Sequence, residues 1–391
     1  MTTVTDFKKI LGRMQVENLG IYVHVPFCRA RCRFCAFYME SLREDRIQAF
    51  MDGLAHELRL YACTLRLRKV PVHTIYFGGG TPTTLAPRQL ARILNDIRYW
   101  FAVEDDAEVS IEVHPGTVLP DGLGILRQSG FTRLSVGAQS FDQNELRDLG
   151  GRAFGAEVRQ AVSWAQSAGF TNISLDLMYG FPGQSMESWQ RTLDEALSLL
   201  PTHVSCYAYT LEEGSPFHRE IMQGKGSAPD QEFQLVLEDE AVNRLVAAGF
   251  ERYEISNYCR AGYECRHNMR YWHVLPYLGL GPSAQSSLGH VRFGNVADLE
   301  SYADSLKRGA LPLDEVTSLS PDQVDRERMV WRLRTLSGVP VRMKSTEQKT
   351  ALLQTIRQLR EQGLLQMEKR GRVRLTDLGM RFVDTVCAAL L

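Results

Sequence analysis

Six short apolar runs, each followed by a segment of helical periodicity, constrain the fold of this chain more than any other feature. The runs cover residues 20–25, 73–77, 108–113, 132–137, 172–180 and 203–209. Buried strands of a parallel sheet read as nearly continuous apolar runs, and the helices between them cover the outer face of the sheet. The pattern predicts an α/β fold built on a partial (β/α)6 barrel, in which the chemistry lies at the carboxyl ends of the strands.

Three cysteines stand close together directly after the first of these runs. Cys28, Cys32 and Cys35 have the spacing C-x3-C-x2-C. A structural zinc site usually takes two separated ligand pairs, and this loop contains neither a second pair nor a histidine. Closely spaced cysteines on one loop are an established arrangement for holding an iron–sulfur cluster. The triplet therefore predicts a 4Fe–4S cluster whose fourth iron is open to a substrate or cofactor.

The overall charge and hydropathy exclude several other classes of protein. Lys and Arg total 45 and Asp and Glu total 46, so no global field attracts nucleic acid or an anionic membrane. We find neither a signal peptide at the N-terminus nor a run of apolar residues long enough to span a bilayer. We expect a cytoplasmic protein, in which clustered cysteines bind metal or react more often than they form disulfides.

Glycines and polar side chains follow several of the predicted strands. Gly78–Gly80 follow the second strand, Glu112 and Gln139 end the third and fourth, and Asp176 lies late in the fifth. Three glycines let the backbone approach a ligand and point amides at it, as in an anion-binding nest. Each polar residue alone could be a hydrogen-bonded core group. Because all of them fall at one end of one barrel, we expect them to line a ligand site.

These motifs resemble the radical S-adenosylmethionine (SAM) superfamily, whose GGE-type motif is similar to the run GGGTP at residues 78–82. In that family the open iron of the cluster chelates SAM, and an electron from the cluster cleaves SAM to a 5′-deoxyadenosyl radical. The resemblance implies that Cys28, Cys32 and Cys35 hold the cluster. It implies SAM contacts at Tyr22, Phe34, Gly79, Gly80, Thr81, Glu112, Gln139, Arg152 and Asp176, although the family's arginine aligns with Gly151, one residue before Arg152.

From about residue 20 to 300 the motifs are similar to those of the HemN-like group of this superfamily. They include IYFGGGTPTTL, IEVHPGT, RLSVGAQSF and LDLMYGFPGQ. The oxygen-independent coproporphyrinogen III dehydrogenase of that group carries a further cysteine two residues after the triplet, where this chain has Phe37. The segment HNMRYW instead resembles the H-N-x-x-Y-W signature of the heme chaperone (HemW) family. Ala36 and Gln285 depart from the usual residues of the group.

The resemblance implies a heme chaperone that delivers heme to target proteins. It also implies an electron donor of the flavodoxin or ferredoxin type and heme-accepting proteins as partners. Two alternatives in the same group are a methyltransferase that uses a second SAM and the coproporphyrinogen III dehydrogenase, an oxidoreductase. Whether the chain is an enzyme stays open at this point.

The segment 253–273 is the candidate heme or substrate site. Cys265 and His267 are possible axial ligands of heme iron, and Tyr271 and Trp272 offer flat apolar faces to a macrocycle. The resemblance also marks Asn268. An alternative of equal weight is that His267 and Asn268 cap a turn while Tyr271 and Trp272 pack the junction with the C-terminal region.

The C-terminal region has the pattern of a separate unit. We expect a lead segment at 1–19, the radical SAM barrel at 20–310 and a C-terminal domain at 311–391, opened by a polar connector at 311–323. The order helix, helix, strand–turn–strand is typical of a winged helix. Residues 341–391 contain 10 Lys and Arg against 5 Asp and Glu. This excess is small, so we expect no nucleic-acid partner.

Overall fold

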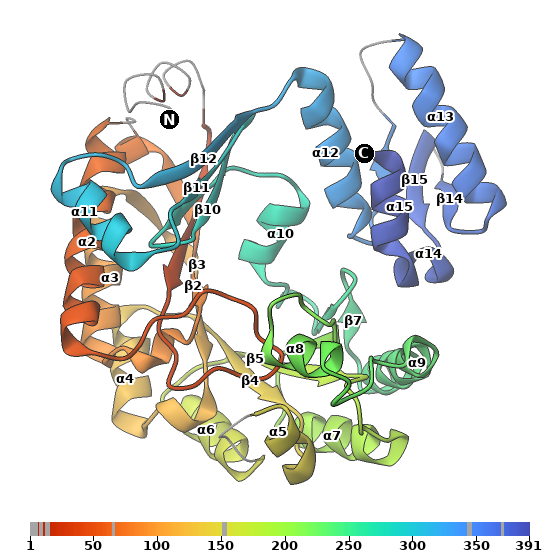
Figure 1. Cartoon of the computed structure of the whole chain (residues 1–391), viewed down its shortest axis with the longest axis horizontal. Helices are drawn as coiled ribbons and strands as arrows, with labels where there is room; N and C mark the ends of the chain where they lie inside the picture. Colours follow the sequence, from red (N-terminus) through yellow and green to blue (C-terminus); the bar gives the residue numbers. More distant parts are fainter. Residues whose placement is uncertain are drawn as a thin grey trace.

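The computed structural model describes residues 7, 11, 16–64, 67–150, 155–341, 346–368 and 371–391. Six strands lie side by side in chain order and parallel to one another, which confirms the predicted parallel α/β core (Figure 1). They are β1 (Leu19–Val25), β2 (Pro71–Gly79), β3 (Ala102–Val113), β4 (Arg133–Gln139), β5 (Asn172–Tyr179) and β6 (His203–Ala208). Each one coincides with a run expected from the sequence.

Helices surround the outer side of this curved sheet (Figure 1). They are α2 (Glu44–Thr64), α3 (Pro87–Trp100), α4 (Pro120–Ser129), α6 (Gly155–Ser167), α7 (Met186–Ser198) and α9 (Gln231–Ala247). Their apolar faces and the outward side chains of the strands form one continuous core, which includes Val109, Ile111 and Leu175. Burial of this apolar surface is the main favourable term in folding.

The inner face of the sheet is polar, which differs from the continuous apolar strands expected from the sequence. Along β3, Glu108, Ser110 and Glu112 share one face, because successive side chains of a strand alternate between faces. The other strands contribute the same kind of residue to this face. They are Thr74, Tyr76, Arg133, Ser135, Ser174, Asp176, His203 and Ser205. Buried polar groups need partners, so this face holds either an internal network or a ligand.

The sheet continues beyond both ends of the parallel core, and in the described part of the chain it has the order β12-β11-β10-β9-β1-β2-β3-β4-β5-β6-β8-β7. The added strands are β7 (Glu251–Arg252), β8 (Asn257–Cys259), β9 (Tyr277–Leu280), β10 (Gln285–Leu288), β11 (Val291–Asn295) and β12 (Leu313–Ser318). Strand β12 lies within the segment expected as a polar connector. Its side chains are mostly exposed at the sheet edge, and the polar residues of such an edge strand resemble those of a loop in the sequence. Helix α11 (Leu299–Lys307) precedes it and packs on α2.

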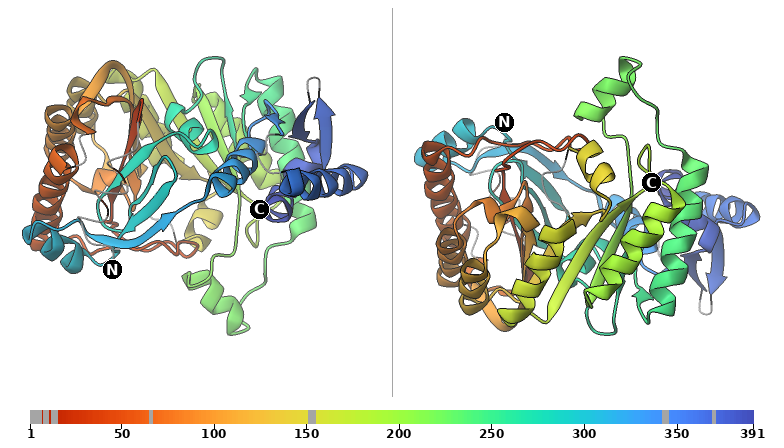
Figure 2. Two further views of the ribbon diagram at one scale, coloured as in Figure 1. Left: turned by 90° about the horizontal axis from the view of Figure 1, so that it is seen from above. Right: turned by 90° about the horizontal axis from the view of Figure 1, so that it is seen from below.

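A second hydrophobic core lies in the C-terminal region, to one side of the sheet in both views of Figure 2. Its elements are α12 (Pro321–Leu333), β13 (Val339–Pro340), α13 (Thr346–Glu361), β14 (Leu365–Glu368), β15 (Arg372–Leu375), α14 (Asp377–Arg381) and α15 (Val383–Leu390). The three strands form a small antiparallel sheet, as expected for a winged-helix-like unit. The domain limits set from the sequence remain a prediction. Every helix in the described ranges is too short or too polar to cross a membrane.

Candidate cofactor site at the carboxyl ends of the strands

The cysteine triplet lies in the loop that leaves the carboxyl end of β1. All three thiols are free and partly buried, and the amide of Cys35 donates to the carbonyl of Cys32 at 3.2 Å. Burial, with the nearby Cys35 and Cys28 thiols, raises the pKa of Cys32 to about 11. No group of three His, Cys, Asp or Glu side chains in the described ranges is gathered in a metal-binding arrangement. The thiols of such a loop must lose their protons to bind a cluster, so cluster binding would release protons.

The glycines after β2 allow the cysteine loop to approach the strand. A Cβ on Gly80 would lie 2.7 Å from the carbonyl oxygen of Phe27 and 3.0 Å from Sγ of Cys28. The amides of Gly80 and Thr81 donate to the carbonyls of Val25 and Phe27 at 2.8 and 2.7 Å. These two amides donate to the protein's own backbone and not to a ligand, and SAM contacts at this turn stay a prediction. Three thiols on a loop that only glycine admits against β2 fit a cluster better than an isolated metal ion.

Two buried carboxyl groups lie on the inner face next to this loop. Burial, followed by the charge of Asp176, raises the pKa of Glu112 to about 8, although Tyr76 donates to Glu112 Oε1 at 3.1 Å. Asp176 accepts from Ser135 at 3.0 Å and from Ser174 at 3.2 Å, and burial raises its pKa as well. Both carboxyl groups would gain from a cationic ligand with hydroxyl donors, which is the chemistry of SAM.

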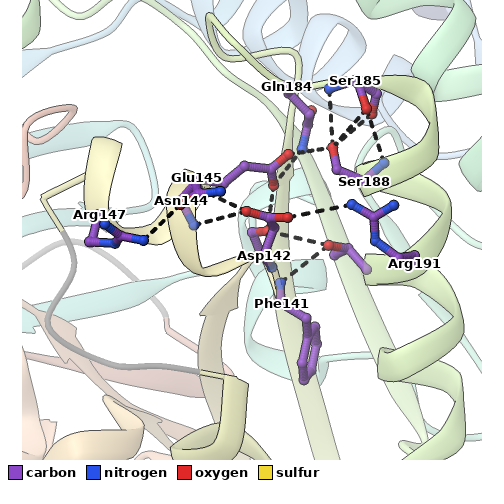
Figure 3. A network of polar contacts seen from close by, with 11 residues as sticks. Phe141, Asp142, Asn144, Glu145, Arg147, Gln184, Ser185, Ser188 and Arg191 are labelled. Atoms are coloured by element: carbon purple, nitrogen blue, oxygen red, sulfur yellow. Dashed lines mark hydrogen bonds and ion pairs between the residues drawn. The ribbon is translucent and has the colours of Figure 1, made fainter.

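The backbone of Gln139 has an unusual left-handed conformation. Its φ of 61° lies in the left-handed region, which residues other than glycine adopt rarely and at a cost. The network in Figure 3 fixes the chain just beyond it. Asp142 caps α5 (Gln143–Asp148) by accepting the amide of Asn144 at 2.8 Å, and it pairs with Arg191 of α7 at 3.4 Å. The surrounding structure thus holds the end of β4 in this conformation.

Two further predicted SAM contacts are Tyr22, which is in register with Tyr76 of β2, and Phe34, which lies in the cysteine loop. Tyr22 on β1 places its hydroxyl 3.3 Å from Nδ1 of His24, and its ring stacks on Tyr76 with centroids 6.2 Å apart. Phe34 packs against a small cluster with Leu149, Phe181 and Tyr209. Phe181 lies two residues after β5 and Tyr209 directly after β6, so Phe34 connects the cysteine loop to the ends of these strands. Arg152 lies outside the described residues.

The H-N-x-x-Y-W segment forms helix α10 (Arg266–Trp272) and lies farther down the inner face. Glu108 accepts the amides of Arg266 and His267, each at 3.0 Å, and so caps this helix. Glu108 is four residues before Glu112 on the same face of β3, a distance of about 13 Å along the strand. Helix α10 therefore closes the inner face on the side away from the cysteine loop.

His267 is not an accessible imidazole at the barrel mouth, contrary to the expectation of a heme ligand there. Its side chain is fully buried, and burial lowers its pKa to about 3. Nδ1 lies 2.8 Å from Oγ1 of Thr74, and Nε2 lies 2.9 Å from the hydroxyl of Tyr271. Both nitrogens already have partners, so an iron at His267 would require this core to open.

The other candidates in this segment also serve packing. Cys265 is fully buried, and burial raises the pKa of its thiol to about 12. Trp272 stacks on Trp331 of α12, with centroids 5.8 Å apart and ring planes at 27°, and Arg334 lies 4.9 Å above the Trp272 ring. Trp272 thus packs the junction with the C-terminal region, as the alternative interpretation predicted. Asn268 is half-buried.

Comparison with known proteins now identifies the relatives of this site. The Radical SAM superfamily pattern matches residues 22–196. The chain is 35% identical to the heme chaperone HemW of Mycobacterium tuberculosis (strain ATCC 25618 / H37Rv), over 97% of each chain. The chain belongs to the HemW family of radical SAM proteins. HemW of Bacillus subtilis is 30% identical and covers 81% of this chain and 84% of its own.

A solved structure has the same overall fold. Coproporphyrinogen III oxidase (HemN) from Escherichia coli, a radical SAM enzyme, superposes with a TM-score of 0.85 at 25% identity, over 99% of this chain and 93% of that one. Membership of the radical SAM superfamily implies a 4Fe–4S cluster and SAM. In this HemW-family chain, the three loop cysteines and the two buried carboxyl groups fit these two cofactors.

Sequence reasoning missed a buried chain of polar residues that joins the two parts of the site. Ser174, which donates to Asp176, lies 2.7 Å from Nδ1 of His203, and Nε2 of His203 lies 2.8 Å from the hydroxyl of Tyr253. The amide of Cys265 donates to that hydroxyl at 3.3 Å. Hydrogen bonds therefore run from Asp176 to the start of α10. The polar alternation within β5 and β6 was the signal that could have revealed it.

Proposed function

We propose that this chain is a cytoplasmic heme chaperone of the HemW type, which binds heme and delivers it to target proteins. The observation that carries the proposal is the 35% identity to a heme chaperone over 97% of both chains. Phe37 supports it, because its side chain is 68% exposed at the position where a coproporphyrinogen dehydrogenase has a further cysteine. A phenyl ring there cannot replace the chemistry of a thiol.

In this proposal, Cys28, Cys32 and Cys35 hold the 4Fe–4S cluster, and Tyr22, Glu112, Gln139 and Asp176 hold SAM. When bound, the cluster supplies one electron at a time and an open iron for SAM. The raised pKa of Glu112 keeps a proton on that carboxyl near neutrality until a cationic ligand displaces it.

The surface of the cysteine loop supports an electron donor of the flavodoxin or ferredoxin type. Arg29 and Arg31 are exposed beside the predicted cluster ligands. Two positive charges next to the cluster would attract a donor with an anionic surface and orient it for electron transfer. Heme-accepting proteins complete the proposed set of partners.

Anaerobic reconstitution followed by three separate assays tests the function. Hemin should bind with a shifted Soret band and pass to an apo-hemoprotein, and coproporphyrinogen III should remain unconverted. Labelled SAM should transfer no methyl group. Methyl transfer without heme binding would replace this proposal with the methyltransferase that uses a second SAM. Conversion of coproporphyrinogen III would replace it with the dehydrogenase.

A further inference from the structure

The far end of the H-N-x-x-Y-W helix opens into a cavity, although its first turn is buried. His273 ends α10 and lines a cavity of about 460 Å³ between α10, α12 and β13. A second cavity of about 380 Å³ shares the lining residues His273, Arg332 and Pro340 with the first. The two cavities therefore meet at His273 and Arg332.

We propose that this pair of cavities is the heme-binding site of the chain, with the His273 imidazole as an iron ligand and Arg328, Arg332 and Arg372 as partners of the heme propionates. The inference rests on the proposed heme-chaperone function and gives it a location. It places the iron ligand six residues after His267 on the same segment, at a histidine that faces a cavity.

The size and walls of the cavities suit a flat tetrapyrrole. Ligand sites usually measure about 300–1,000 Å³ and combine apolar walls with a few polar groups. Val274, Leu275, Pro276, Met329 and Val339 supply the apolar wall of the first cavity. A macrocycle would bury its faces against these side chains and place its carboxylates at the cationic rim.

The positive charges of three arginines that line the site suit an anionic ligand. Arg328 and Arg332 are one helical turn apart on α12, so they share a face. Arg372 lines the second cavity and donates to the carbonyls of Ser337 and Gly338 at 2.7 and 2.6 Å, which fixes its position. Guanidinium groups pair well with carboxylates.

Two acidic residues, Glu17 and Asp325, also line the first cavity. Asp325 lies 4.0 Å from Arg328, and Glu17 lies two residues before β1. They offset part of the positive charge around Arg328, but the second cavity has no acidic lining residue among those described. The imidazole of His273 lines both cavities, and imidazole is a common metal ligand.

The stacked indoles beside the site hold its two walls together. Trp272 precedes His273, and it stacks on Trp331, which precedes Arg332. This contact fixes α10 against α12 and so sets the separation of His273 from the arginines. The packing role of the H-N-x-x-Y-W signature and the binding of heme are then parts of one arrangement.

Titration of the full-length protein with hemin and with iron-free protoporphyrin IX tests the site. His273→Ala should shift the Soret band and weaken hemin binding about tenfold or more, which is about 1.4 kcal/mol, and leave protoporphyrin IX binding unchanged. Arg328→Gln and Arg372→Gln should weaken the binding of both. His56→Ala is the matched control, because His56 lies on α2, away from both cavities, and its Nδ1 bonds to the carbonyl of Asp52 at 2.7 Å.

The outcomes separate the location from the function. Wild-type binding of hemin together with an unchanged spectrum and affinity in His273→Ala would overturn the proposed site and leave the chaperone function standing. Equal loss of hemin and protoporphyrin IX in His273→Ala would overturn iron ligation by this residue. If the wild type binds neither compound, both the site and the proposed function fail. Circular dichroism of each variant excludes unfolding as the cause of any loss.

Discussion

Nε2 of His203 lies 2.8 Å from the hydroxyl oxygen of Tyr253, in a part of the core where His203 has no exposed surface. Ser174 donates to Asp176, so Nδ1 of His203 carries the proton that bonds to Ser174, and Nε2 accepts from Tyr253. In this series of hydrogen bonds, each donor therefore lies on the side away from Asp176 and each acceptor on the side toward it. A continuous series of hydrogen bonds therefore connects Asp176, the predicted SAM carboxylate, to the first residues of α10.

We expect His203→Ala to lower the free energy of unfolding by about 1–3 kcal/mol, because Ser174 and Tyr253 would lose a buried partner. Urea denaturation of the purified protein measures this loss. Tyr253→Phe should cost less, because it removes one hydroxyl and leaves the ring in place. His56→Ala is the control and should change stability by no more than about 0.5 kcal/mol. A stability equal to wild type in His203→Ala would show that these bonds do not form.

Replacing Cys28, Cys32 or Cys35 by alanine should abolish the iron–sulfur cluster, because three thiolates on one loop leave no spare ligand. Iron and sulfide analysis of anaerobic wild-type protein should give about four of each per chain. Cys63 is exposed on α2, and Cys63→Ala should keep the full cluster content. Stoichiometric zinc without visible absorption would contradict the assignment.

Gly80→Ala should reduce cluster content, because the new Cβ would meet the carbonyl of Phe27 at 2.7 Å and the thiol of Cys28 at 3.0 Å. Visible absorption after reconstitution measures the loss. Gly124→Ala is the matched control, because within the described residues no atom beyond its own stretch of α4 lies within 4 Å of its Cβ position. Alanine is a better helix former than glycine there, so the control should be at least as stable as wild type. Equal cluster content in both variants would rule out steric control by Gly80.

Glu112 should make the stability of the cofactor-free protein depend on pH. Its pKa of about 8 in the folded state is higher than in the unfolded chain, so the folded state binds more protons between about pH 4.5 and pH 8. Stability should therefore fall as pH rises through this window, by at most about 1.4 kcal/mol per pH unit. Thermal unfolding of wild type and Glu112→Gln compares the slopes. The same slope in both proteins would assign the effect to another group.

The strands and the cysteine loop could be predicted because they depend on local patterns. Each of the six apolar runs became a parallel strand, and the polar residues at their ends met at one edge because parallel strands share a direction. The periodicity of apolar residues also predicted the order of helices and strands in the C-terminal region. The positions of Glu112, Gln139 and Asp176 late in their strands followed from these elements, whereas their assignment to SAM rests on the family resemblance and stays a prediction.

The burial and the hydrogen-bond partners of the H-N-x-x-Y-W segment were decided by the tertiary structure. The partners of His267 are Tyr271, Thr74 and Glu108, and the last two are 193 and 159 residues away in the sequence. No local pattern states that a histidine will meet a threonine and a capping carboxylate from two other strands. The sequence by itself determined which segments become strands and where thiols and carboxyl groups lie along them. Only long-range packing decided that His267 is enclosed and that His273 faces a cavity, because burial depends on which distant surfaces meet.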